Sequence, residues 1–266
     1  MMHSAAMVLG LIILGLTGKA QEWQLIKTTR LETSCELSSK DRNNNLYIAD
    51  IRGSIYQYDQ QGNQLNLYST KQLGQIYLLE SWQGLRTFAF YQDLQEYLIA
   101  DRFLSNERTY QLPPNSYIRL ATLSQDLNLW TLGEDNLLLR KINTTDQSIM
   151  IENQWSSDFT GEDLNVTYLK EYKNRLYLLD KGQRVIVFDN FGNYITVIEA
   201  EGVQTISFTD TYLLANQVDS VVKINLNSLE REAIDLPTNA DQLYVINGVY
   251  YLITENQLAL YSYKPL

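Results

Sequence analysis

Acidic residues recur at equivalent positions along the sequence, each after a short apolar run and at the start of a turn. The six that share this place are Asp50, Asp93, Glu134, Asp180, Asp219 and Glu255. Carboxylates there can accept hydrogen bonds from the backbone N–H groups of their own turns. If they gather on one surface, they can instead attract a basic segment of a partner or a hard cation such as Ca²⁺. The pattern leaves both interpretations open.

Other side chains that carry chemistry are scarce, because the chain has one histidine, His3, and one cysteine, Cys35. Ser-His-Asp and Cys-His mechanisms need an imidazole, and zinc sites often use histidine as well. Cys35 lies in an expected strand with no basic residue close in sequence, which indicates a buried apolar thiol. The sequence therefore favours a non-catalytic protein. Two alternatives need only acids: a paired-carboxylate hydrolase and a Ca²⁺-dependent lactonase.

The N-terminal segment predicts export. Residues 5–16 form an apolar run that is too short to span a bilayer. Gly18 and Ala20 occupy the two positions that a signal peptidase reads, which predicts a cleaved signal peptide over residues 1–20. The alternative, a buried N-terminal helix, is disfavoured because every later segment has a strand pattern. We expect one domain over residues 21–266, in the periplasm or outside the cell, or peripheral to the outer membrane.

The charge of the chain narrows the choice of partner. Without residues 1–20 the chain has 20 basic and 31 acidic residues, a net charge of −11. Nucleic-acid binding depends on clustered Lys and Arg, and an anionic membrane surface also selects for cations. We therefore expect no nucleic acid and no direct membrane insertion. A protein partner is expected for a chain that is monomeric on its own, with no cofactor unless the acids bind Ca²⁺.

An internal repeat positions the acidic residues. Each unit has an aromatic anchor in a strand that precedes the acidic turn, and the clear anchors are Tyr47, Trp130, Tyr177, Tyr212 and Tyr251. With Phe88 as the missing anchor the spacings are 41, 42, 47, 35 and 39 residues. Tyr97 would give 50 and 33 for the first two. The more even series predicts that "TFAFYQD" (87–93), and not "EYLIAD" (96–101), is the counterpart of "LYIAD" (46–50).

Six units of about forty residues predict an all-β fold, a six-bladed β-propeller of four-stranded antiparallel blades. Each unit has an expected innermost strand before its anchor. These strands are residues 34–38, 75–81, 117–124, 165–172, 205–210 and 242–247. The last unit lacks an outermost strand, and "EWQLIKT" (22–28) is free to supply it. That pairing would join the two ends of the chain in one sheet and remove exposed edges.

Two resemblances accompany the repeat. "LYLLDKGQRVIVFDNFGNYI" (176–195) resembles the NHL-type propeller repeat, which implies the propeller fold and a recognition surface but no chemistry. Residues 78–104 and 120–134 resemble a stretch in small secreted bacterial propellers. That second resemblance implies one alternative, a periplasmic plug-type subunit of the type 9 secretion translocon.

Together these features predict a recognition or scaffold propeller. Its expected site is the face that carries the acidic loops, and its expected ligand is a basic or hydroxyl-rich segment of a protein, in an outer-membrane or secretion complex.

Overall fold

The computed structural model describes residues 22–70, 74–81, 85–114, 117–134, 138–155 and 164–264. The predicted signal peptide over residues 1–20 lies outside these residues, as does the cleavage position. Within the described ranges all regular structure is β-strand. No described helix is long and apolar enough to cross a membrane.

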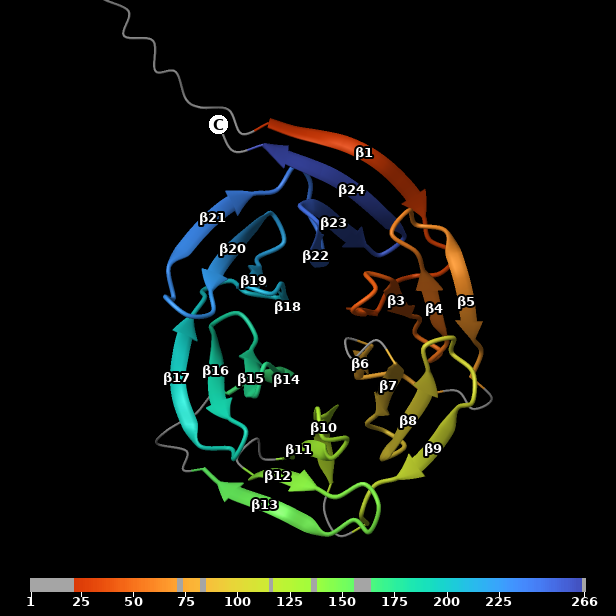
Figure 1. The fold of residues 1–266 in the computed structure, drawn as a ribbon, viewed down its shortest axis with the longest axis vertical. Helices are drawn as coiled ribbons and strands as arrows, with labels where there is room; N and C mark the ends of the chain where they lie inside the picture. The colour runs from red at the N-terminus through yellow and green to blue at the C-terminus, as the bar shows by residue number, and fades with distance from the viewer. Residues whose placement is uncertain are drawn as a thin grey trace, which may run out of the picture.

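Six four-stranded antiparallel sheets stand side by side in a ring, each with its first strand at the hub (Figure 1). The predicted six-bladed propeller is confirmed. Blade 1 consists of β2 (Leu37–Lys40), β3 (Leu46–Ala49), β4 (Ile55–Tyr58) and β5 (Gln64–Tyr68). Blade 2 consists of β6 (Leu78–Glu80), β7 (Arg86–Tyr91), β8 (Glu96–Asp101) and β9 (Arg108–Gln111). Blade 3 consists of β10 (Ile118–Leu123), β11 (Leu129–Gly133), β12 (Leu138–Ile142) and β13 (Ile149–Gln154). Blade 4 consists of β14 (Val166–Tyr172), β15 (Arg175–Asp180), β16 (Arg184–Asp189) and β17 (Tyr194–Glu199). Blade 5 consists of β18 (Thr205–Phe208), β19 (Tyr212–Asn216), β20 (Ser220–Asn225) and β21 (Arg231–Asp235). Blade 6 consists of β22 (Gln242–Ile246), β23 (Val249–Thr254), β24 (Gln257–Lys264) and, outermost, β1 (Glu22–Arg30).

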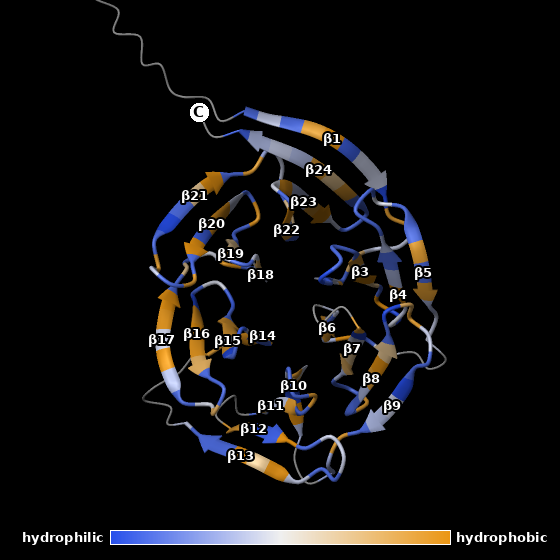
Figure 2. Cartoon of the chain, in the orientation of Figure 1, coloured by the Kyte–Doolittle hydropathy of each residue, from blue (hydrophilic) through white to orange (hydrophobic). Residues whose placement is uncertain are grey.

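The position of a strand within its blade decides its composition. Second strands are covered on both faces by neighbouring blades, so they are buried except at some of their ends; all four residues of β3, for example, are buried. Outermost strands have one face in solvent and carry both hydrophilic and hydrophobic segments, as Figure 2 shows for β5, β13 and β21. This difference explains why the second strands gave the clearest repeat signal.

The aromatic anchors occupy equivalent strands, as the spacing predicted. Phe88 lies in β7 and Tyr47 in β3, each the second strand of its blade. Tyr97 lies in β8, a third strand, and pairs with Phe90. The likeness of "EYLIAD" to "LYIAD" is therefore accidental.

The two ends of the described chain close the ring. Strand β1 pairs antiparallel with β24, with Trp23 opposite Tyr263 and Arg30 opposite Gln257 (Figure 1). The Trp23 ring packs edge-on against Tyr250 at 4.9 Å and tilted against Tyr263 at 4.6 Å. Its Nε1 donates to the carbonyl of Asp235 in blade 5, at 3.0 Å. The predicted closure by residues 22–28 is confirmed and extends to Arg30.

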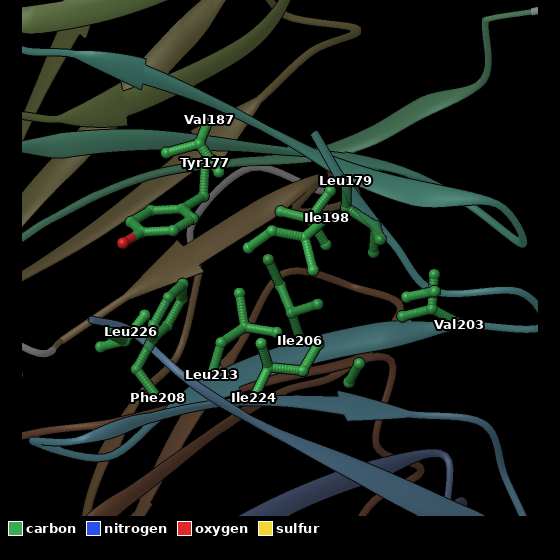
Figure 3. Close-up of a cluster of buried hydrophobic side chains, with 13 residues drawn as sticks. Tyr177, Leu179, Val187, Ile198, Val203, Ile206, Phe208, Leu213, Ile224 and Leu226 are labelled. Carbon is green, nitrogen blue, oxygen red and sulfur yellow. The ribbon is translucent and has the colours of Figure 1, made fainter. Parts of the chain in front are cut away.

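Apolar side chains fill the wedges between blades. Between blades 4 and 5, Tyr177 and Val187 face Phe208 and Leu213 (Figure 3). The Tyr177 and Phe208 rings meet edge to face, with centroids 4.9 Å apart. Because every blade is covered by two neighbours, each wedge stabilises both sheets that line it.

One predicted strand is displaced. The innermost strand of blade 1 was expected over residues 34–38, but β2 begins at Leu37. The preceding residues are held by blade 6 instead: Cys35 N–H donates to the carbonyl of Glu255 at 2.6 Å. Cys35 is thus half-buried beside the strand, not within it, and burial raises the pKa of its thiol to about 12. The thiol remains protonated at neutral pH, which fits an unreactive cysteine.

Candidate functional site at the two faces of the hub

Strand order divides the connections between two faces. In an antiparallel blade, the connection between the first and second strands lies at the opposite end from the one between the second and third strands. The latter shares its end with the segments that lead from one blade to the next. We call this end the acidic face, defined by the second-to-third-strand turns and the inter-blade segments, and the other end the opposite face.

All six acids predicted as site residues lie on the acidic face. Asp180 is the last residue of its second strand, and the other five follow theirs, within the turn to the third strand: Asp50, Asp93, Glu134, Asp219 and Glu255. The phase of the repeat therefore predicted their common side. Their exposure differs, however, and divides them into two groups.

Asp50 and Asp180 are buried, and their carboxylates bond within the fold. Asp50 Oδ1 accepts from the backbone N–H groups of Arg52 at 2.9 Å and Ser54 at 2.8 Å. Asp180 Oδ1 accepts from Asn165 N–H at 3.0 Å, while its Oδ2 pairs with Arg184 Nε at 3.0 Å. The turn-capping interpretation therefore fits Asp50, whereas the Asp180 carboxylate joins the start of β14 to the Arg184 side chain.

Asp93, Glu134, Asp219 and Glu255 are exposed. Asp93 accepts a hydrogen bond from the hydroxyl of Tyr77 at 3.3 Å. Asp219 accepts from Ser220 Oγ at 3.0 Å, and Glu255 from Ser34 Oγ at 3.4 Å. Single hydroxyl contacts of this kind leave most carboxylate acceptor positions open to solvent. These four side chains are available to a partner.

The inter-blade segments add acids that the repeat did not predict. Four more exposed carboxylates lie on the acidic face: Glu32, Glu36, Glu201 and Asp241. In the described connections of this face, eight exposed carboxylates stand against two exposed cations, Arg52 and Lys181. The inter-blade segments vary in length and have no repeated pattern, so sequence reasoning had no signal for them. Among the described residues, no group of three or more His, Cys, Asp or Glu side chains could hold a metal ion.

A cavity of about 330 Å³ lies at the hub on the acidic face. Its rim carries Glu36 and Asp241, together with Lys181. We call it the narrow cavity. The charge of its rim follows that of the surrounding face.

A second cavity, of about 890 Å³, lies at the hub on the opposite face. Connections between first and second strands contribute Arg42, Lys173 and Asp210 to its lining, and strands contribute other residues. We call it the wide cavity. Tyr168, Ile206 and Tyr244 line both cavities and so separate them. The sequence analysis did not predict this cavity.

Between the blades at the hub, a buried carboxyl lies near a buried amine. Glu80 ends β6 and accepts a hydrogen bond from Thr122 Oγ1 at 2.6 Å, while its Oε1 has no hydrogen-bond partner. Burial raises the pKa of Glu80 to about 7, and the nearby Lys170 opposes that rise. Burial lowers the pKa of Lys170, which Glu80 partly restores. A Glu in β6 and a Lys in β14, both innermost strands, were the only sequence signal for this pair.

The raised pKa of Glu80 predicts a dependence of stability on pH. The unfolded carboxyl titrates near 4.5 and the folded one near 7, so the folded state binds more protons within this window. Stability contributed by Glu80 is present below the window and is lost as pH rises through it. We expect the free energy of unfolding of Glu80→Gln to rise relative to wild type by about 2 kcal/mol between pH 5 and pH 8.

Urea unfolding at several pH values would measure this difference. Glu152→Gln is the matched control, because Glu152 is exposed and its substitution removes one carboxylate outside the hub. A difference between Glu80→Gln and wild type that stays constant from pH 5 to pH 8 would contradict the assignment of a raised pKa to Glu80.

Comparison with solved structures supports the fold. Virginiamycin B lyase from Staphylococcus aureus, solved with quinupristin, has a TM-score of 0.63 and 12% identity, covering 91% of this chain and 99% of the lyase. The β-propeller domain of Swd1 from Myceliophteria thermophila gives 0.60 and 11%, covering 91% and 99%. BamB from Moraxella catarrhalis gives 0.52 and 11%, covering 91% and 100%.

No family model and no curated protein matches the chain. At 11–12% identity the three similar structures show the fold alone. Since one of them is an enzyme, the shared fold does not decide between catalysis and binding. It is compatible with a protein-binding propeller.

Proposed function

We propose that this protein is a non-catalytic recognition propeller that binds a basic segment of a protein partner on its acidic face. The observation that carries the proposal is the charge of that face, where the connections that the structure describes have eight exposed carboxylates against two exposed cations. Fields of one sign around a concave surface attract and orient a partner of the opposite sign. A Lys- or Arg-rich loop or terminus is the segment that such a surface selects.

The geometry supports a broad surface more than a single point of contact. Among the described residues, Asp93, Glu134, Asp219 and Glu255 follow second strands of blades 2, 3, 5 and 6, Glu36 precedes blade 1 and Glu201 follows blade 4. The rigid ring fixes their spacing, because each turn is anchored to a buried second strand. A partner segment laid over the hub would meet carboxylates on several sides.

Catalysis is less well supported by the residues at hand. The similar lyase was solved as a catalytically inactive variant in which alanine replaces a histidine. This chain's one histidine, His3, lies in the segment predicted to be a signal peptide. A paired-carboxylate hydrolase needs accessible acids, and two of the six predicted acids, Asp50 and Asp180, are buried. A scaffold role needs neither histidine nor a second acid at a fixed separation.

The predicted signal peptide bears on where the partner lies. Export over residues 1–20 would deliver the chain to the cell envelope, so we expect the partner to be an envelope or secreted protein with a basic segment. A permanent place in an outer-membrane or secretion complex is compatible with this expectation.

Quantitative capture from an envelope extract tests the proposal. The face variant changes Asp93, Glu134, Asp219 and Glu255 to their amides. The control variant makes the same change in total charge away from the acidic face, at Glu22, Asp146, Glu152 and Glu230. We expect wild type and the control to capture the same partner. The captured amount of that partner should fall at least about tenfold with the face variant, because several rim charges are lost.

Mass spectrometry of the captured proteins reads out the result. Both variants should melt near the wild-type temperature, because the substituted side chains are exposed. Equal capture of the same proteins by wild type and both variants would contradict a role for the acidic face.

A further inference from the structure

The wide cavity has its own composition, distinct from that of the acidic face. Four consecutive blades in the ring, blades 4, 5, 6 and 1, supply almost all of its lining. Five Lys or Arg residues and three Asp or Glu residues line it, a net charge of +2 in a chain whose net charge is −10. Positive charge is thus concentrated at one place in an acidic protein.

The cations approach the hub from opposite sides. Lys40 and Arg42 come from blade 1, and Lys170 and Lys173 from blade 4, which is three blades away in a ring of six. Lys40 and Lys170 are near enough for the charge of one to lower the pKa of the other. Converging ammonium groups repel one another, and an anion placed between them would relieve that repulsion.

Most acids of the lining already have partners in the fold. Asp41 is buried and accepts from Asn45 N–H at 2.9 Å and from the Tyr47 hydroxyl at 3.2 Å. Glu232 pairs with Lys223 at 2.7 Å. Asp210 is exposed on the rim, where its backbone carbonyl accepts from Lys173 Nζ at 2.6 Å. Glu232 thus offsets Lys223, Asp41 and Asp210 act on Lys40, and Glu80, outside the lining, acts on Lys170. Arg42 and Lys173 add positive charge at the exposed rim.

Aromatic side chains stand between the two groups of cations. Tyr172 of blade 4 stacks on Phe208 of blade 5, with centroids 4.6 Å apart. Tyr168, Tyr212 and Tyr244 also line the cavity and are half-buried, so they retain surface toward it. Flat apolar faces beside cations suit a ligand that has a ring as well as a negative charge.

The size and depth of the cavity favour a small ligand over a chain. Its volume of about 890 Å³ lies within the usual range for small-molecule sites, about 300–1,000 Å³. Tyr168, Ile206 and Tyr244 separate it from the narrow cavity, so an occupant would enter from the opposite face and stop at these side chains.

We propose that the wide cavity binds a small organic anion with a flat ring. The cations of blades 1 and 4 hold its carboxylate or phosphate group, and the aromatic side chains of blades 4, 5 and 6 hold its ring. This site is separate from the acidic face, so it neither requires nor excludes the partner proposed above.

Calorimetric titration of the full chain with matched probes tests the proposal. One pair is 2-naphthoate and its neutral amide; the other is adenosine 5′-monophosphate and adenosine. We expect one anion at least to bind 1:1 with Kd below about 1 mM. Its neutral counterpart should bind at least tenfold more weakly, and added NaCl should weaken the binding of the anion. The two pairs distinguish a carboxylate ligand from a phosphate ligand.

Variants locate the binding. Arg42 and Lys173 are exposed, so the double variant Arg42→Ala/Lys173→Ala should fold and should bind the anion at least fivefold more weakly. Lys181→Ala removes an exposed cation of the acidic face and should bind as wild type does. Lack of binding by both anions, equal binding of a neutral counterpart, or unchanged affinity in the double variant would overturn the proposal. Tighter binding of hexaglutamate than of either ring anion would overturn it in favour of an acidic peptide.

Discussion

Replacement of Glu171 by alanine should lower the free energy of unfolding by about 3 kcal/mol or more. Glu171 lies in β14, the innermost strand of blade 4. Its Oε2 accepts hydrogen bonds from two groups of blade 3, Trp130 Nε1 at 2.7 Å and Ser124 Oγ at 2.6 Å. Both donors are buried. Alanine would leave the indole N–H without its acceptor at a site that excludes water, and would loosen the wedge between the two blades.

Thermal and urea unfolding measure this effect, which corresponds to a fall in Tm of roughly 6–12 °C for a domain of this size. Glu171→Gln keeps one acceptor oxygen and should cost less than half as much. Glu152→Ala removes an exposed carboxylate that pairs with Arg140, and should change stability by less than about 1 kcal/mol. A Tm for Glu171→Ala within 2 °C of wild type would show that the buried bridge between blades contributes little.

Removal of β1 should have a still larger effect. A chain that begins at Leu31 lacks eight residue pairs between β1 and β24, together with the packing of Trp23 on Tyr250 and Tyr263. At about 0.5–1.5 kcal/mol for each net hydrogen bond, and with a large aromatic side chain lost, we expect destabilisation of at least about 5 kcal/mol. The unpaired edge of β24 should also promote self-association.

A chain that begins at Glu22 is the matched control, since it differs only by the nine residues of β1. Addition of a synthetic peptide of residues 22–30 to the truncated chain should restore part of the stability. Equal melting temperatures for the two chains would show that the ring does not depend on closure by its N-terminal strand.

Much of the fold was predictable because second strands carry strong, repeated signals. Tyr47, Phe88 and Trp130 are each almost fully buried, so the repeat retains a large side chain at that position. The closing strand was predictable for a different reason: the last unit had three strands where the others had four. The start of β2 was not predictable, because residues 34–36 alternate like a strand, but Cys35 N–H bonds to Glu255 of blade 6.

The candidate site was predictable in its side of the ring but not in its membership. The repeat placed Asp50 and Asp219 at the same end of their blades, yet only a structure shows that backbone N–H groups enclose Asp50 while Asp219 is exposed. Glu36 and Asp241 lie in segments with no repeat at all. The lining of the wide cavity brings together Lys40 and Lys170, which are far apart in sequence.

The two faces therefore differ in charge as well as in loop type. The acidic face carries exposed carboxylates around a small cavity, whereas the opposite face carries converging cations around a larger one. A propeller separates such fields well, because its rigid sheets hold the two sets of loops at opposite ends of the strands. One chain could thus hold a basic partner on one face and a small anion on the other.

Carbodiimide cross-linking in intact cells tests the central claim most directly. The reagent joins a carboxylate to a nearby lysine amine as an amide, so it reports which acids touch a basic partner. We expect the cross-linked peptides of this chain to contain Glu36, Asp219, Asp241 or Glu255, each joined to a lysine of the same partner. Cross-links confined to Asp210 on the opposite face, or to Glu152 on an outermost strand, would contradict the proposal that the acidic face is the binding surface.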